Sequence, residues 1–210
     1  MKIGVLGATG LAGRAVVKLA LSINYEVIAI ARNPQKIKPI EGLKIRQGDV
    51  TDTQSLIKAF NGVDVVISCI GFANNKNQET LMSRGTMNII ETCQKTNVKK
   101  FVMMSGILQS DGKELSFLNR MGIKIIRIFY RKVYKDKIIA EDALQRSPLD
   151  WTIVRPAGLT KEPGDGNYIA GEKTKISPFN PLPVDDCADC LLKAVSKKEW
   201  NKKIINVGKL

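Results

Sequence analysis

The chain has 210 residues, which is enough for one well-filled domain and short for two. Its apolar fraction of 44% is ordinary for a globular protein, and no apolar run reaches the length of a membrane-spanning helix. The net charge of +13 would attract phosphate groups on a nucleic acid, a membrane surface or a small ligand. The opening run "MKIGVLGATG" is too short and too rich in glycine for a secretory signal, so we expect a cytoplasmic protein.

Short β-branched runs alternate with stretches of helical spacing along the first three quarters of the chain. The predicted strands occupy residues 2–7, 25–31, 43–50, 63–71, 99–106 and 149–156. The predicted helices occupy residues 11–22, 51–60, 78–97 and 131–147. Alternation of this kind, with strands that are apolar on both faces, is typical of a parallel sheet covered by helices. We therefore predict an α/β fold, with a Rossmann-like doubly wound parallel sheet in three α/β/α layers.

The last segment, residues 157–210, is more polar and is interrupted by glycine and proline. The predicted loops, at 158–168 and 178–183, enclose a predicted strand pair at 168–177. A late helix at 184–196 and a late strand at 202–208 follow. We interpret residues 1–210 as a single domain to which 157–210 adds a small cap on the substrate side.

Three glycines in "GATGLAG" follow the first predicted strand and open the first predicted helix. They are Gly7, Gly10 and Gly13. Glycine at these positions permits a tight turn, close approach of the backbone to a pyrophosphate and close packing of the helix on the sheet. The helix N-terminus then offers N–H groups and a positive dipole end to the phosphates. We predict a dinucleotide site here that also includes Thr9 and Leu11, and the alternative is an ordinary glycine turn.

The end of the second strand carries the signal for the form of the cofactor. An NAD site usually has Asp or Glu here to bind the ribose hydroxyls. This chain has Ala31 followed by Arg32, with Lys36 nearby. Because a guanidinium suits a 2′-phosphate, we predict NADP (NADPH) in preference to NAD. The alternative is that Arg32 is an ordinary surface arginine.

The ends of the third and fourth strands supply the remaining predicted contacts of the cofactor. Asp49 and Val50 follow the third strand and are expected to flank the adenine. Cys69, Ile70 and Gly71 end the fourth strand and are expected beside the ribose and pyrophosphate. Both placements follow from the binding of ligands at the carboxyl ends of parallel strands, although either segment could equally be a plain loop.

The cysteines give little indication of redox or metal chemistry. Cys187 and Cys190 form the CxxC motif "CADC", whose spacing places both thiols on one face of a helix. Such a pair could hold a metal or cycle as a dithiol, but the chain has no histidine and no second CxxC to complete a zinc site. We interpret the two cysteines as small core residues and predict no metal site.

The densest basic segment, residues 124–137, contains six basic residues and one acidic residue. No nucleic-acid motif accompanies it, and aromatic residues make up only 6% of the chain. We therefore expect a solvated, lysine-rich surface. Nucleic-acid binding driven by charge alone is the weaker alternative.

Six segments of the chain together resemble the atypical branch of the short-chain dehydrogenase/reductase superfamily, which includes NmrA-like NAD(P)H-binding proteins and biliverdin-IXβ (flavin) reductase. These segments are "GATGLAGR", "ARNPQKI", "GDVTD", "VISCIG", "VYKDKIIAEDAL" and "LDWTIVRPAGLT". The resemblance implies a Rossmann-like fold and an NAD(P) cofactor. It further implies a nicotinamide near the ends of the fifth and sixth strands, at Ser105, Lys137, Pro156 and Ala157.

Catalytic members of the superfamily carry Tyr-x-x-x-Lys, in which the tyrosine donates a proton and the lysine lowers its pKa and holds the nicotinamide ribose. Lys137 matches the lysine, but the tyrosine position holds Val133. Tyr134 is rotated by roughly 100° on a helix from the expected face. The resemblance therefore implies that Lys137 binds ribose, while the alternative is a solvent-facing lysine. Tyr134 and Ser105 remain candidate catalytic residues beside it.

Two functions are compatible with this pattern. The first is an NADPH-dependent reductase that passes hydride to a flavin, quinone or other conjugated or carbonyl acceptor, flanked by Tyr134 or by the loop 106–120. The second is a non-catalytic, NmrA-like regulator that senses NAD(P) and binds a partner through residues 124–137. We expect a small-molecule electron acceptor, no membrane or nucleic-acid partner, and a monomer in preference to a dimer.

Overall fold

The computed structural model of the chain describes residues 1–71, 80–110 and 117–210. Within these ranges the main sheet has the strand order β3-β2-β1-β4-β5-β6-β10-β8. Neighbouring strands are parallel, except that β8 runs antiparallel to β10. The strands are β1 (Lys2–Leu6), β2 (Glu26–Ala31), β3 (Leu43–Gln47), β4 (Val65–Ser68), β5 (Lys100–Met104), β6 (Asp150–Pro156), β8 (Tyr168–Gly171) and β10 (Lys203–Lys209).

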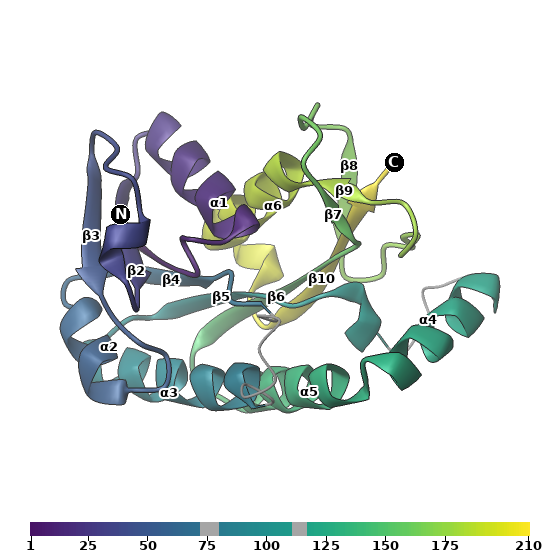
Figure 1. Cartoon of the computed structure of the whole chain (residues 1–210), viewed down its shortest axis with the longest axis horizontal. Coiled ribbons are helices and arrows are strands. Elements are labelled where there is room, and N and C mark those ends of the chain that lie inside the picture. The colour runs from purple at the N-terminus through teal and green to yellow at the C-terminus, as the bar shows by residue number, and fades with distance from the viewer. Residues whose placement is uncertain (72–79, 111–116) are drawn as a thin grey trace.

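Helices cover both faces of this sheet (Figure 1). On one face α1 (Leu11–Ser22) packs against α6 (Val184–Ser196). On the other face α3 (Leu81–Thr96) lies between α2 (Thr53–Ala59) and α5 (Arg131–Gln145). The predicted Rossmann-like, three-layer fold is confirmed. The predicted helix at 78–97 begins at Leu81, and its residues 78 and 79 lie outside the described residues.

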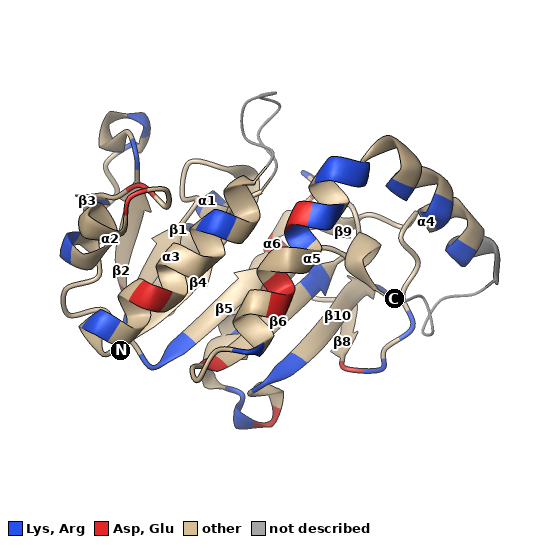
Figure 2. Cartoon of the chain, turned by 90° about the horizontal axis from the view of Figure 1, so that it is seen from below, with Lys and Arg blue, Asp and Glu red and all other residues tan. Residues whose placement is uncertain are grey.

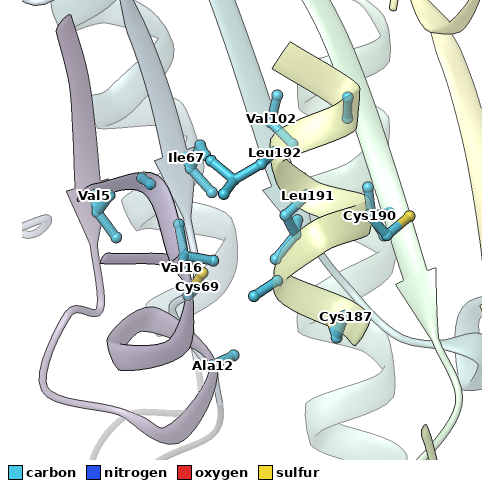
Figure 3. Packing of buried hydrophobic residues seen from close by; sticks show 14 of the residues in the cluster. Val5, Ala12, Val16, Ile67, Cys69, Val102, Cys187, Cys190, Leu191 and Leu192 are labelled. Atoms are coloured by element: carbon cyan, nitrogen blue, oxygen red, sulfur yellow. The ribbon is translucent and has the colours of Figure 1, made fainter. Parts of the chain in front are cut away.

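The larger hydrophobic core lies between the sheet and the α1–α6 layer (Figure 3). Cys187 and Cys190 are fully buried in it, together with Leu191 and Val16. Burial raises the pKa of both thiols of the CxxC pair above the usual range. Thiols that are buried and protonated in this way are poor nucleophiles. The interpretation of this pair as core residues is confirmed.

Residues 157–210, which were expected to form a cap, supply helix α6 and strands β8 and β10 to the main layers. The strand pair predicted at 168–177 is wrong in its second half, because only Tyr168–Gly171 is a strand. That strand pairs with β10. The residues after it do not continue the pairing, and Ile176 packs over Gly208 of β10. Two short strands, β7 (Leu159–Thr160) and β9 (Leu182–Pro183), form a separate parallel pair where loops were predicted.

Helix α4 (Phe117–Phe129) was not predicted. The expected loop at 106–120 contains a short 3-10 helix at Ile107–Gln109 and the start of α4, while 111–116 lie outside the described residues. The run "IKIIRIF" at 123–129 is rich in isoleucine, whose branched β-carbon lowers helix propensity. The spacing of its apolar residues was therefore the only local feature that indicated a helix.

The N-terminus of α3 is held by a carboxylate from α5. Asp136 accepts hydrogen bonds from the backbone amides of Met82, at 2.8 Å, and Ser83, at 3.0 Å, and from the Ser83 hydroxyl. The N-cap residue of α3, Thr80, makes no capping bond with its own side chain. Asp136 is buried, so its charge satisfies amides that would otherwise lack partners at the positive end of the helix dipole.

A buried ion pair fastens α5 to the sheet. Arg155 on β6 donates from Nε to Glu141 Oε1 at 3.1 Å and from Nη2 to Glu141 Oε2 at 2.5 Å. The side chains of Arg155 and Glu141 are only 11% and 3% exposed. Removing one partner of such a pair would leave the other charge buried. Helix α5 is thus tied to α3 through Asp136 and to β6 through Glu141.

Replacing Asp136 with alanine should lower the free energy of unfolding by about 2–3 kcal/mol, because two amides and a hydroxyl lose their acceptor. Denaturant titration followed by circular dichroism measures the loss. The matched control is Asp142→Ala on the same helix, whose carboxylate pairs with Arg146 at the surface. An exposed pair of this kind should cost less than about 0.5 kcal/mol. Equal losses in the two variants would contradict the capping role.

Candidate functional site

A cavity of about 440 Å³ opens at the carboxyl edge of the sheet. It lies where β1 has β2 on one side and β4 on the other, the switch point at which doubly wound sheets bind ligands. The lining residues that the sequence predicted are Gly7, Thr9, Gly10, Leu11, Arg32, Lys36, Val50, Cys69, Ile70 and Gly71. The other lining residues are Leu6, Ala12, Ile30, Ala31, Asn33, Gly48, Leu81, Met104 and Leu159.

Two glycines set the shape of the turn between β1 and α1. Gly7 has a positive φ of 76°, and a Cβ there would lie 2.7 Å from the carbonyl oxygen of Cys69. Gly13 does not line the cavity but packs behind the turn, where a Cβ would lie 2.2 Å from the Gly7 carbonyl oxygen. A side chain at either position would push backbone against backbone. The glycine spacing therefore permits α1 to begin directly at the end of β1.

Helix α1 begins without a side-chain cap. Gly10 occupies the N-cap position, and its amide donates to the Gly7 carbonyl at 2.9 Å. By contrast, the Asp52 carboxylate caps α2 by accepting from two amides of its first turn. Residues of the first turn of α1 line the cavity. An uncapped N-terminus beside a cavity is suited to an anion, and the pyrophosphate of a dinucleotide fits it.

One end of the cavity is basic. Arg32 and Lys36 line it with Asn33, and both cationic side chains are exposed. A 3-10 helix at Pro34–Lys36 turns the chain back, with the Lys36 amide donating to the Asn33 carbonyl at 3.1 Å. Strand β2 ends at Ala31, and none of the lining residues that the structure describes is acidic. Two cations without a carboxylate provide a setting for an additional phosphate.

Asp49 does not line the cavity, although its neighbour Val50 does. The Asp49 carboxylate accepts from the amide of Thr51 at 2.9 Å and from its hydroxyl at 2.8 Å. The Asp49 amide donates to the hydroxyl of Ser55 at 2.9 Å. Asp49 therefore shapes the turn into α2.

Ser105 and Lys137 lie together, beyond the residues that line the cavity. The Lys137 ammonium donates to the Ser105 carbonyl at 3.5 Å, and the Ser105 hydroxyl is 3.5 Å from Gln109 Oε1. Burial lowers the pKa of Lys137 below its usual range, although the charges of Glu141 and Asp136 oppose this shift. Lys137 is therefore a half-buried cation at the end of β5, in contrast to the solvent-facing alternative.

The sixth strand ends close by. Pro156 and Ala157 are buried and do not line the cavity, and the Ala157 amide donates to the Val207 carbonyl at 3.0 Å. Leu159, in the same segment, does line it. The roles expected of Ser105, Lys137, Pro156 and Ala157 at the nicotinamide remain predictions.

Tyr134 is turned towards α4. Its ring lies 4.7 Å from the guanidinium carbon of Arg127. Arg127 in turn donates from Nε to the Leu108 carbonyl at 2.8 Å and from Nη2 to the Ser110 carbonyl. Val133, at the position expected for a catalytic tyrosine, is half-buried. Tyr134 thus belongs to the packing of α4 against the segment after β5.

The apolar lining residues that sequence reasoning missed include Leu81, Met104 and Leu159, which lie away from the β1–α1 turn. Met104 directly precedes the predicted Ser105, and successive strand residues face opposite sides of a sheet. The cavity wall therefore contains Met104, while the neighbouring Ser105 lies outside it. Asn33 was also missed, although it lies between the predicted Arg32 and Lys36.

The sequence profile of a family described as NAD(P)H-binding matches residues 7–198. The chain belongs to this NAD(P)H-binding family. Membership confirms the resemblance to NAD(P)H-binding proteins that the sequence motifs indicated. It also agrees with the uncapped helix N-terminus and the glycine turn of the cavity.

Two relatives illustrate the range of the NAD(P)H-binding family. An uncharacterized chloroplast protein of Arabidopsis thaliana is 29% identical over 98% of this chain and 76% of its own length. The chloroplast divinyl chlorophyllide a 8-vinyl-reductase of the same plant is 26% identical over 97% of this chain. The match covers 52% of that reductase, so the chain spans about half its length.

Solved structures share the fold. An oxidoreductase from Lactococcus lactis matches with a TM-score of 0.84 at 23% identity, over 100% of this chain and 91% of that one. An anaerobillin reductase from Escherichia coli matches with a TM-score of 0.82 at 20% identity, over 100% and 97% of the two chains. These structural similarities support the Rossmann-like architecture of this chain.

The Gly13→Ala variant should lose about 2 kcal/mol or more of folding free energy, because its Cβ would overlap backbone atoms that cannot rotate away. Thermal unfolding and NADPH titration on the same preparation measure the effect on stability and on the site. Gly158→Ala is the control, since no atom lies within 4 Å of a Cβ placed there. If Gly13→Ala unfolds at the wild-type temperature and binds normally, the close approach at Gly7 is not a constraint.

Proposed function

We propose that the protein is an NADPH-dependent reductase of the atypical short-chain dehydrogenase/reductase type. The choice of cofactor rests on the pair of cations, Arg32 and Lys36, at one end of the cavity, whose described lining residues include no acidic side chain. The other end of the cavity reaches Met104 and Leu159, near the ends of β5 and β6. Such an elongated site suits a dinucleotide lying across the switch point of the sheet.

Different residues at the site would bind different parts of the cofactor. Arg32 and Lys36 would hold a 2′-phosphate, and the first turn of α1 would hold the pyrophosphate. Lys137, held beside the Ser105 carbonyl, would bind the nicotinamide ribose from the far side of the β5 end. When bound in reduced form, the cofactor would supply a hydride to the acceptor.

The acceptor should require little acid catalysis from the protein. Val133 replaces the tyrosine of the usual dyad, and Tyr134 is occupied by its contact with Arg127. Flavins, quinones and extended conjugated molecules spread the charge that arrives with the hydride, so water can supply the proton. The names of two similar proteins, a divinyl chlorophyllide a 8-vinyl-reductase and an anaerobillin reductase, support a conjugated acceptor.

Calorimetric titration should give tighter binding of NADPH than of NADH. Arg32→Ala and Lys36→Ala should each weaken NADPH binding by about tenfold, as expected for one exposed charge-assisted contact, and leave NADH binding within about twofold. Lys38→Ala is the matched control, because Lys38 is exposed and does not line the cavity. Equal effects on both cofactors would remove the argument for a 2′-phosphate site, and no binding of either would overturn the proposed function.

Oxidation of NADPH in the presence of FMN or a quinone should saturate with acceptor concentration. Lys137→Met should lower kcat/KM by about 10–100-fold through poor positioning of the cofactor, while Tyr134→Phe should stay within about threefold of the wild type. A large loss in Tyr134→Phe would identify that hydroxyl as a proton donor and contradict the assignment. Tight binding without turnover would favour the alternative function, an NAD(P)-sensing regulator.

A further inference from the structure

Exposed apolar side chains gather on one helix. Met121, Ile125, Ile128 and Phe129 of α4 are 50%, 55%, 73% and 81% exposed. Positions i, i+4, i+7 and i+8 share one face of a helix, so the four side chains form a continuous strip about 12 Å long. These four residues are termed the α4 strip. Burial of this strip would remove a large apolar area from water.

The orientation of α4 is fixed by its opposite face. Ile123 is 2% exposed and packs in a small core with Ile107 and Ile176. Gly122 lies so close to the ring of Phe179 that a Cβ would be 2.4 Å from it, and Arg127 bonds the segment after β5. At 100° per residue, the members of the α4 strip are rotated by about 120–160° from Ile123. The strip therefore points away from the body, and α4 lies at the edge of the molecule (Figure 1).

Cations flank the α4 strip. Residues 117–135 include six Lys or Arg and no Asp or Glu. Lys124, Arg131 and Lys135 are exposed, and Figure 2 shows basic residues along α4 and the start of α5. The first acidic residue after this stretch, Asp136, is buried against α3. Within residues 117–135, the surface thus combines exposed isoleucine and phenylalanine with lysine and arginine and contains no acidic residue.

We propose that α4 lies in the interface of an anionic lipid membrane, with the α4 strip among the upper acyl chains and the flanking cations at the lipid phosphates. An amphipathic helix of this composition binds by apolar burial together with attraction to anionic headgroups. A second copy of the chain docked on α4 would bring the six cations of each copy together, and a nucleic acid would leave the strip in water. Within the described part of the chain no helix is long and apolar enough to cross a bilayer, so the contact is peripheral. The proposed membrane contact differs from the expectation, drawn from the sequence, of no membrane partner.

Co-sedimentation of the full chain with vesicles tests the membrane contact. Phosphatidylcholine vesicles containing phosphatidylglycerol should bind the protein, and pure phosphatidylcholine vesicles should bind it at least about tenfold more weakly. The variant Ile125→Ser/Ile128→Ser should lose about tenfold or more of the binding. Its control, Ile23→Ser/Ile40→Ser, removes isoleucines of similar exposure elsewhere and should bind as the wild type does.

A second pair of variants tests the charge. Lys124→Ala/Lys135→Ala should weaken binding by about fivefold per lysine, and added salt should do the same to the wild type. The control, Lys18→Ala/Lys58→Ala, removes the same charge from exposed positions outside α4. Thermal unfolding of every variant verifies that the fold is kept, independently of cofactor binding.

Three results would overturn the membrane contact: equal binding by the variants of α4 and their controls, equal binding to neutral and anionic vesicles, or no binding of the wild type. If the wild type does not bind vesicles, light scattering tests whether the α4 strip instead contacts a second copy of the chain. A dimer that Ile125→Ser/Ile128→Ser disperses would assign the α4 strip to a second copy of the chain instead.

Discussion

The candidate site depends on the contact of three backbone segments at Gly7. The turn after β1, the first turn of α1 and Cys69 after β4 meet there with no space for a β-carbon at Gly7 or Gly13. Because the opposing atoms belong to the backbone, no side-chain rotation could relieve an overlap. The same contact brings the N-terminus of α1 to the point where β1 separates β2 from β4. The cavity and its anion-binding end therefore follow from one packing constraint.

The position of Lys137 depends on helix α5. Lys137 lies between two acidic residues of the same helix that bind different elements. Asp136 caps α3, and Glu141 forms the buried pair with Arg155 of β6. These bonds fix both the rotation and the translation of α5, and with them the position of the Lys137 ammonium beside the Ser105 carbonyl. A half-buried cation with a lowered pKa is held there by electrostatic contacts made by its neighbours.

The sequence was sufficient to predict the fold and the part of the cavity around α1, because those signals are local. Glycine spacing, alternation of strands and helices, and the basic residues after β2 can each be read within a few positions. The cap of α3 could not be predicted, since Asp136 and Met82 are 54 positions apart and no local pattern connects them. Met104 lines the cavity and was not predicted, whereas its neighbour Ser105 lies outside the lining, because a single step along a strand exchanges one face for the other. Helix α4 was missed because its isoleucines favour strands by propensity, while its apolar face is not covered by the body of the protein.

The position of Tyr134 connects two unusual features of this chain: the altered spacing between tyrosine and Lys137, and the exposed apolar strip of α4. In the usual dyad a tyrosine precedes the lysine by four residues and serves as an acid. Here the tyrosine precedes Lys137 by three residues, and its ring contacts Arg127 of α4. Arg127 also bonds the carbonyls of Leu108 and Ser110, in the segment that follows β5. Tyr134 therefore helps to hold α4 against the body, and its contact with Arg127 is one of those that turn the apolar strip of α4 outward.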